Sequence, residues 1–428
     1  MKFAAILAVA ASTLALAAPA LAQQQQRQVI HAGHLIRDAE GAFDGPATIT
    51  VEGGRILSIE DGLQPAPAGA ELIDLSDKTV MPGLIDLHVH LDGNPSGDFR
   101  DAAVESDEWA TLTGAVNARS TLAAGFTTVR DMGSYPQSMF AVRRAVAEGT
   151  MPGPRILASG PPLAIIGGHG DVSGFRPEVN DALDTGFTCT GPAECAARVR
   201  QAAQNGSDWI KITATGGVLS QQGRGLEAHF THAEMEAIVE VASALGLDVA
   251  AHAHGARGIE AAANAGISTI EHGTYLDPGA LDAMAEHGTV LVPTLMAFQG
   301  VIERLDTGVY TPTVETKIRQ VAEIVGDAVR EARRRGITVA FGTDAGVFEH
   351  GRNAGEFALL TQAGLTDREA VASATTVAAR VLHMEDEIGR LAPGYSADMI
   401  ALDGNPLENA ALLEDVDWAM AGGRALAD

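Results

Sequence analysis

The sequence predicts a (β/α)8 barrel, or TIM barrel, combined with a small β-sandwich domain that both ends of the chain form. Three observations predict this α/β fold. Strand-like and helix-like segments alternate through the middle of the chain, eight such pairs fit into about 300 residues, and both ends contain short strands between Gly, Asp and Pro turns. The predicted units are a leader at residues 1–22, the sandwich at 23–81 plus 386–428, and the barrel at 82–385.

The leader has the three parts of a secretory signal peptide. Lys2 gives the positive start, an apolar segment extends from Phe3 to Ala18, and Ala20 and Ala22 form a small-x-small cleavage site. The apolar part of the leader is too short and too rich in Ala for a confident membrane span, and no later stretch approaches the roughly 20 apolar residues needed. We therefore expect a periplasmic or secreted protein that has no membrane partner.

Composition limits the partners further. The chain of 428 residues has 29 Lys and Arg against 55 Asp and Glu, which gives a formal net charge of -26. Such a charge argues against binding to nucleic acid or to anionic membrane surfaces.

The two cysteines, Cys189 and Cys195, flank the turn-forming residues 190–192. In an oxidising compartment they are expected to form a disulfide that closes a small loop. The alternative is a pair of free thiols.

The terminal segments share a short, strand-like pattern. Gly and Pro exclude a long helix after residue 385, so both ends are expected to share one domain. The expected strands are 29–36, 47–51, 55–59, 70–75, 397–402 and 418–421.

The barrel strands are expected where apolar runs precede segments with room for a helix. The clearest helical stretches are 231–245 and 314–335. Active sites of this fold lie at the C-terminal ends of the strands. The eight expected strands are 84–90, 127–131, 156–160, 209–213, 249–254, 269–273, 290–294 and 338–344.

Metal-binding residue types gather at these strand ends. Side chains alternate along a strand, so two histidines separated by one residue point to the same face. A single His-x-His pair is more often structural, but five strands that all end in such residues make coincidence improbable. The set comprises His88 and His90, Lys211, His252 and His254, His272, and Asp344.

The combination resembles the metal-dependent amidohydrolase superfamily over nearly the whole mature chain. Two flanking segments strengthen the resemblance, namely VMPGLIDLHVH at residues 80–90 and IGRLAPGYSADM at residues 388–399. A neutral, desolvated lysine can add CO2 and become an anionic carbamate. The resemblance implies that Lys211 carries this carbamate and bridges two divalent metal ions.

The resemblance also assigns the remaining ligands. One metal takes His88, His90 and Asp344, the other takes His252 and His272, and a bridging hydroxide is the nucleophile. Imidazole and carboxylate ligands fit Zn2+ best, with manganese, iron and cobalt left open. Asp344 is expected to act as general base and then general acid; the alternative for Asp344 is a helix cap.

Further contacts are predicted around this centre. His254 should lie near the substrate or the developing oxyanion, or make a supporting hydrogen bond. His169 resembles an active-site loop histidine of the prolidase-like branch. Tyr275, His350 and Arg352 are expected to meet a substrate carboxylate, with a purely structural role as the alternative for each.

The strand-end motifs resemble the prolidase or Xaa-amino-acid dipeptidase branch, which includes hydrolases of ochratoxin A. This resemblance implies hydrolysis of an amide bond to a C-terminal amino acid, in dipeptides or N-acyl amino acids, by a homo-oligomer. An imidazolonepropionase-like or deaminase-like ring hydrolase is an alternative, which the presence of Lys211 disfavours. A non-catalytic metal-binding scaffold is a further alternative, which the complete ligand set disfavours.

Overall fold

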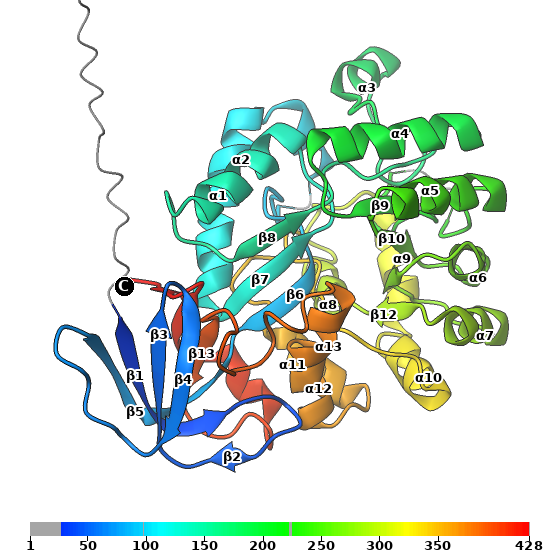
Figure 1. Ribbon diagram of the computed structural model, residues 1–428. Coiled ribbons are helices and arrows are strands. Elements are labelled where there is room, and N and C mark those ends of the chain that lie inside the picture. Colours follow the sequence, from blue (N-terminus) through cyan, green and yellow to red (C-terminus); the bar gives the residue numbers. More distant parts are fainter. Residues whose placement is uncertain (1–26, 97, 222–224, 428) are drawn as a thin grey trace, which may run out of the picture.

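A sheet built from both ends of the chain forms one side of the molecule (Figure 1). The computed structural model describes residues 27–96, 98–221 and 225–427, so the predicted leader lies outside the described residues. The sheet has the strand order β15-β14-β13-β5-β1-β3-β4, with β2 paired to β1. Its strands are β1 Gln28–Ile36, β2 Phe43–Asp44, β3 Ala47–Glu52, β4 Arg55–Asp61, β5 Glu71–Pro82, β13 Met399–Leu402, β14 Val416–Ala421 and β15 Arg424–Ala425.

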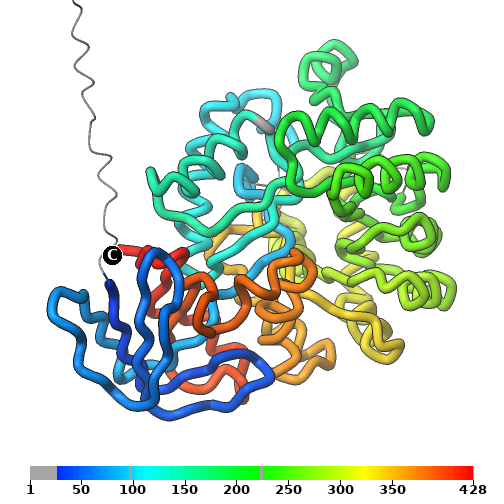
Figure 2. The backbone as a smooth tube through the Cα atoms, in the orientation of Figure 1, coloured from blue at the N-terminus to red at the C-terminus, as the bar shows by residue number. Residues whose placement is uncertain are grey.

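The sheet curls so that its far edge returns to the C-terminal chain. Gly394 N donates to Ile56 O at 2.8 Å, and Ile56 N donates to Tyr395 O at 2.9 Å. Buried residues from both ends, among them Ile49 and Met420, pack in one apolar cluster. Figure 2 shows the two ends of the chain, blue and red, side by side. The predicted boundaries at residues 81 and 386 stay a prediction.

The central strands form two parallel sheets whose residues are almost all buried, as strands covered on both faces require. One sheet contains β6, β7 and β8, and the other contains β9, β10, β11 and β12. Their bounds are β6 Leu84–Val89, β7 Phe126–Asp131, β8 Arg155–Ala158, β9 Ile210–Thr213, β10 Val249–Ala253, β11 Thr269–His272 and β12 Val290–Val292.

Single bridges join the two sheets where no regular ladder runs between them. The bridges are Leu163 with Ile212, Leu291 with Val339, and Val89 with Ala345. The predicted eighth strand at 338–344 is therefore wrong as a regular strand, although its chain occupies the expected place between β12 and β6. The reason is that Thr343 N and Asp344 N both donate to His88 O and Asp344 has a φ of 62°, which interrupts an extended ladder.

Helices surround the strands (Figure 1). They are η1 Phe99–Ala103, α1 Asp107–Ala123, α2 Pro136–Ala147, α3 Pro177–Leu183, α4 Pro192–Asn205, α5 His232–Ala244, α6 Ala256–Asn264, α7 Pro278–His287, α8 Leu295–Glu303, α9 Pro312–Ala322, α10 Asp327–Arg335, α11 Gly355–Gln362, α12 Asp367–Ser373, α13 Thr376–Val381 and η2 Ala410–Glu414. Within the described ranges, none of these helices has the length and apolar character needed to cross a membrane.

Local sequence explains two of the helix boundaries. Thr231 and Glu234 form a capping box that begins α5, as the predicted helix at 231–245 requires. The predicted helix at 314–335 is instead two helices, α9 and α10, because Gly326 adopts a φ of 86° between them.

The predicted disulfide is confirmed. Cys189 and Cys195 are bonded to each other, and both side chains are buried at the start of α4.

Candidate active site

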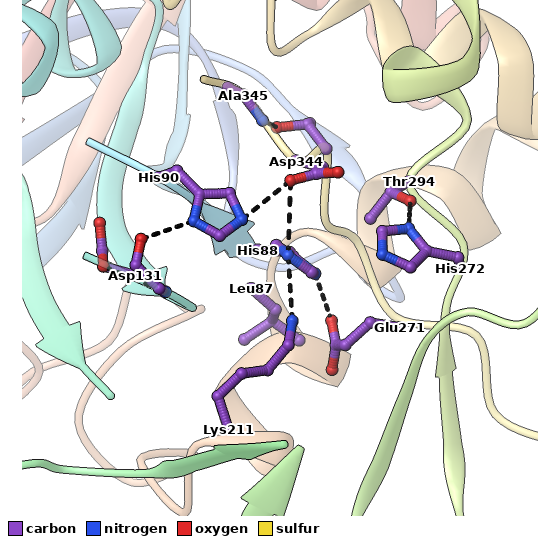
Figure 3. Close-up of polar contacts among 12 residues, drawn as sticks. Leu87, His88, His90, Asp131, Lys211, Glu271, His272, Thr294, Asp344 and Ala345 are labelled. Carbon is purple, nitrogen blue, oxygen red and sulfur yellow. Dashed lines mark hydrogen bonds and ion pairs between the residues drawn. The ribbon is translucent and has the colours of Figure 1, made fainter. Parts of the chain in front are cut away.

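His88, His90 and Asp344 form the first group of candidate metal ligands. His88 lies on β6 and His90 directly follows this strand, and Asp344 comes from the chain segment beside it. Asp344 Oδ1 lies 3.0 Å from His90 Nε2 and 3.5 Å from His88 Nε2. Each imidazole donates its Nδ1 proton away from the group, His88 to Glu271 at 2.7 Å and His90 to the Gly133 carbonyl at 2.6 Å. The two Nε2 atoms therefore face Asp344 (Figure 3).

His252, His254 and His272 form the second group, which comes from the ends of β10 and β11. One ring nitrogen of each lies within 4.8 Å of the others. Nδ1 of His254 is hydrogen-bonded to Thr274 Oγ1 at 2.7 Å, and Nδ1 of His272 to Thr294 Oγ1 at 2.6 Å. Burial lowers the pKa of all three imidazoles, that of His254 to about 3. All three are therefore neutral at pH 7 and have lone pairs for a cation.

Lys211 on β9 lies beside His88, with Nζ 3.3 Å from His88 Nε2. Figure 3 shows His88 between Lys211, His90 and His272, and the His88 and His272 rings are 5.3 Å apart. Burial lowers the pKa of Lys211 to about 8. The neutral amine, the state that can react with CO2, is thus more accessible near pH 7 than in a lysine exposed to water.

The donor atoms fit divalent cations. Asp344 Oδ1 is buried and accepts no hydrogen bond of acceptable geometry from any described residue, although two imidazole nitrogens lie close to it. His252 Nε2 faces the Gly216 carbonyl at 3.4 Å, so its Nδ1 is the nitrogen left for a ligand. Imidazole nitrogens and a carboxylate that converge on one space are the donor set of a Zn2+ site.

Neighbouring positive charges hold Asp344 ionised despite its burial. Burial alone would raise the pKa of Asp344, but the neighbouring His88 and His90 hold that pKa below its usual value. The pKa of His90 is raised to about 9, because the nearby carboxylates of Asp344 and Asp131 outweigh the effect of burial. Asp344 is thus available both as a ligand and as a proton acceptor.

A cavity of about 280 Å3 opens over both groups. Its floor contains the seven side chains described above together with His169, whose ring lies 4.1 Å from that of His252. Its walls are apolar, with Val218 and Leu219 from one loop and Phe298 and Val301 from α8. The floor is suited to bind metals and the walls to bind an apolar group.

Three predicted substrate contacts do not reach this cavity. Tyr275 follows β11 but is only half-buried and lines a different groove. His350 is bonded to Thr121 Oγ1 and to the His90 carbonyl, so it supports the backbone of a ligand. Arg352 forms ion pairs with Glu303 and its neighbour Glu349 at the surface. His169 and His254 are the predicted contacts that the structure brings to the cavity.

Comparison with known sequences agrees with this donor set. The sequence profile of the amidohydrolase family matches residues 79–426. The chain belongs to the amidohydrolase family. Members of this family depend on metals, so the amidohydrolase profile and the histidine groups point to the same centre.

Individual amidohydrolases are similar over most of the chain. Ochratoxinase from Aspergillus niger is 31% identical over 356 residues, which cover 78% of this chain and 72% of that protein. A solved structure of a Xaa-Pro dipeptidase with methionine in its active site has a TM-score of 0.86 and 37% identity and covers 94% of this chain and 100% of that one. A prolidase complexed with N-methylphosphonate-L-proline has a TM-score of 0.84 and 32% identity, with coverages of 94% and 99%. These similarities confirm the predicted superfamily, its prolidase-like branch, the barrel fold and the assignment as a hydrolase.

A buried ion pair that sequence reasoning missed positions the first group in this amidohydrolase. Glu271 accepts from His88 through one carboxylate oxygen and from Arg130 through the other, at 2.7 and 2.9 Å. Burial raises the pKa of Glu271, but Arg130 and His88 outweigh that effect and bring it to about 2. Arg130 also donates to the Leu87 carbonyl at 2.7 Å and lies 4.4 Å above the Trp209 ring. Glu271 thereby fixes the tautomer of His88.

Glu271→Gln should weaken metal binding while it leaves the fold intact. An amide accepts less strongly than a carboxylate and leaves Arg130 without a counter-charge, so we expect metal affinity to fall by about 10- to 100-fold. Competition with a chelator measures this affinity. Glu240→Gln on the exposed face of α5 is the matched control, and equal affinity in the two variants would remove Glu271 from this role.

Proposed function

We propose that this protein is a binuclear, zinc-dependent hydrolase of the amide bond to a C-terminal amino acid, in dipeptides or N-acyl amino acids, with ochratoxin A among its candidate substrates. The observation that carries the proposal is the pair of ligand groups beside the buried Lys211. The similarity to prolidases and ochratoxinase supports the reaction class. The predicted leader supports a periplasmic or secreted location, and the family resemblance supports a homo-oligomer.

Each residue of the centre has a place in this proposal. His88, His90 and Asp344 would hold one Zn2+, and His252 and His272 the other, with Lys211 as a CO2-derived carbamate shared between them. Two bound cations lower the pKa of a water molecule and polarise the scissile carbonyl. The neutral histidines and the lowered pKa of Lys211 support these roles, since each residue must bind in its deprotonated form.

The proton transfers are assigned to Asp344. Its lowered pKa makes it a carboxylate that can accept the proton of the attacking water and pass it to the leaving amine. His254 would contact the carbonyl oxygen of the substrate, because Thr274 holds its Nδ1 and leaves Nε2 on the cavity side. His169 would contact the same end of the substrate, held by Ser220 Oγ at 2.8 Å from its Nδ1.

The cavity walls support an apolar substrate group. Val218, Leu219, Phe298 and Val301 face the space above the metal-binding floor. An aromatic or aliphatic side chain would bury apolar surface there, which is favourable at roughly 25 cal/mol per Å2.

A substrate panel tests the reaction. The zinc-loaded protein is expected to release free amino acids from dipeptides and N-acyl amino acids, fastest for apolar C-terminal residues, and to contain about two metal ions per chain. Amino-acid analysis and metal analysis measure both. Ring opening or ammonia release without a free amino acid would favour the ring hydrolase or deaminase alternative, and bound metal without any turnover would favour a scaffold.

Lys211→Ala should abolish turnover, because the bridging anion is lost. We expect kcat/KM to fall by at least about 100-fold. Added short-chain carboxylic acids should restore part of the activity by occupying the space of the carbamate. The matched control is the corresponding amide, propionamide in place of propionate. Equal rescue by propionate and propionamide would contradict a carbamate on Lys211, as would normal activity of Lys211→Ala without any addition.

Asp344→Asn should reduce kcat much more than it reduces the metal content. The amide retains one oxygen ligand for the metal but cannot accept a proton. A loss of roughly 10^2- to 10^4-fold in kcat is expected for a missing general base. Steady-state kinetics with metal analysis separates the two effects. Asp386→Asn at an exposed position is the control. If Asp344→Asn retains a substantial kcat, Asp344 does not transfer the proton.

A further inference from the structure

A buried lysine lies behind one wall of the cavity. Lys317 on α9 donates from Nζ to two carbonyl oxygens, those of Gly217 and Ser220, each at 2.7 Å. We propose that Lys317 is a positioning residue that determines substrate specificity, because it holds the loop at 214–221 as the wall that receives the side chain of the substrate's C-terminal amino acid. This inference rests on the proposed function.

The two bonds bracket the part of the loop that faces the substrate. Val218 and Leu219 lie between the two tethered carbonyls and line the cavity. Thr311, just before α9, adds a third bond to the same loop, from its Oγ1 to Gln221 Oε1 at 3.0 Å. Loops are otherwise the most mobile parts of a fold. The three hydrogen bonds from Lys317 and Thr311 therefore fix the position of Val218 and Leu219.

Apolar packing surrounds the tether. Val218 packs in one cluster with Phe298 and Val301 from α8 and with Val314 and Ile318 from α9. Lys317 lies on the same helix as Val314 and Ile318, and only 5% of the residue is exposed. Burial lowers the pKa of Lys317 to about 8, so at pH 7 the ammonium keeps all three donors. A buried ammonium that bonds to carbonyls is costly to lose, because both acceptors would then lack a partner.

The loop also sets the position of a floor residue. Ser220 Oγ is hydrogen-bonded to His169 Nδ1 at 2.8 Å, and a Cβ at Gly217 would collide with the His169 ring. Thr213 Oγ1 donates to the His169 carbonyl from the other side. A shift of the loop would therefore widen the apolar wall first, because Thr213 still holds the backbone of His169.

The wall is where substrates can differ. The amide bond of every substrate has to meet the same floor, whereas in this proposal the side chain of the C-terminal residue lies against Val218 and Leu219. Contacts to a side chain that does not react contribute mainly to KM, whereas contacts made only in the transition state contribute to kcat. Loosening the loop is expected to weaken the binding of substrates whose C-terminal residue has a large apolar side chain. The binding of substrates that end in glycine should not change.

Lys317→Met keeps the length of the side chain and removes its donors. We expect the KM for N-acetyl-phenylalanine to rise by about tenfold, with kcat within about threefold and the KM for N-acetyl-glycine within about twofold. Hydrogen exchange of the amides at 216–221 should become faster. Gln320→Met places the same side chain at an exposed position of the same helix and should leave all these values unchanged.

The outcomes decide between the parts of the proposal. Unchanged exchange in Lys317→Met would overturn the tether, and faster exchange with an unchanged ratio of KM values would overturn its role in specificity. A uniform loss of kcat for both substrates would indicate general damage and would also contradict the proposal. Leu219→Ala removes the wall without touching the tether, and it should reproduce the loss of selectivity even if Lys317→Met does not fold.

Calorimetric binding separates this inference from the proposed function. If the zinc-loaded wild type hydrolyses no member of the substrate panel, the proposed function fails. The binding of N-acetyl-phenylalanine and N-acetyl-glycine then still reports on the wall. A ratio of the two dissociation constants that is the same in wild type and Lys317→Met would overturn the inference by itself.

Discussion

A buried carboxylate holds together the two chain segments that carry the first ligand group. Asp86 accepts from the backbone N–H groups of His88 and Thr343, each at 3.1 Å, from Thr343 Oγ1 at 2.6 Å and from Asn353 Nδ2 at 2.9 Å. In the described chain no regular β-ladder joins β6 to the segment that contains Thr343, so these four hydrogen bonds connect the two segments in place of a ladder. They also compensate the cost of burying a carboxylate, which would be severe without donors. The approach of Asp344 to His88 depends on this network.

Close packing at the same place requires glycine on both sides of Asp344. A Cβ at Gly342 would lie 3.2 Å from the His88 backbone nitrogen, and Gly346 has a φ of 114° with its Cβ position 2.6 Å from the His90 carbonyl oxygen. Any larger residue would push the segment away from β6. The spacing of the two glycines around the aspartate is thus part of the geometry of the centre.

Sequence reasoning succeeded where a local pattern fixes the direction of a side chain. Alternation along β6 and β10 places His88 with His90 and His252 with His254, and the barrel topology brings these strand ends to one mouth. It failed at the eighth strand, because the φ of 62° at Asp344 follows from hydrogen bonds to a segment more than 250 residues away in sequence. The prediction of Arg352 as a substrate contact also failed, because the sequence near Arg352 does not indicate its ion pair with Glu303 at the surface.

Glu271 and Arg130 show a signal that the sequence does contain. Both are charged residues inside strands that are otherwise built to be buried, and buried charges are found almost only in pairs. A search for two opposite charges at interior strand positions would have suggested this pair, although they are 141 residues apart. The cavity wall offers no such signal. The shape of the wall depends on how α8, α9 and one loop pack together, whereas the floor depends on strand ends alone. The sequence therefore predicts the metal-binding residues but does not predict the substrate.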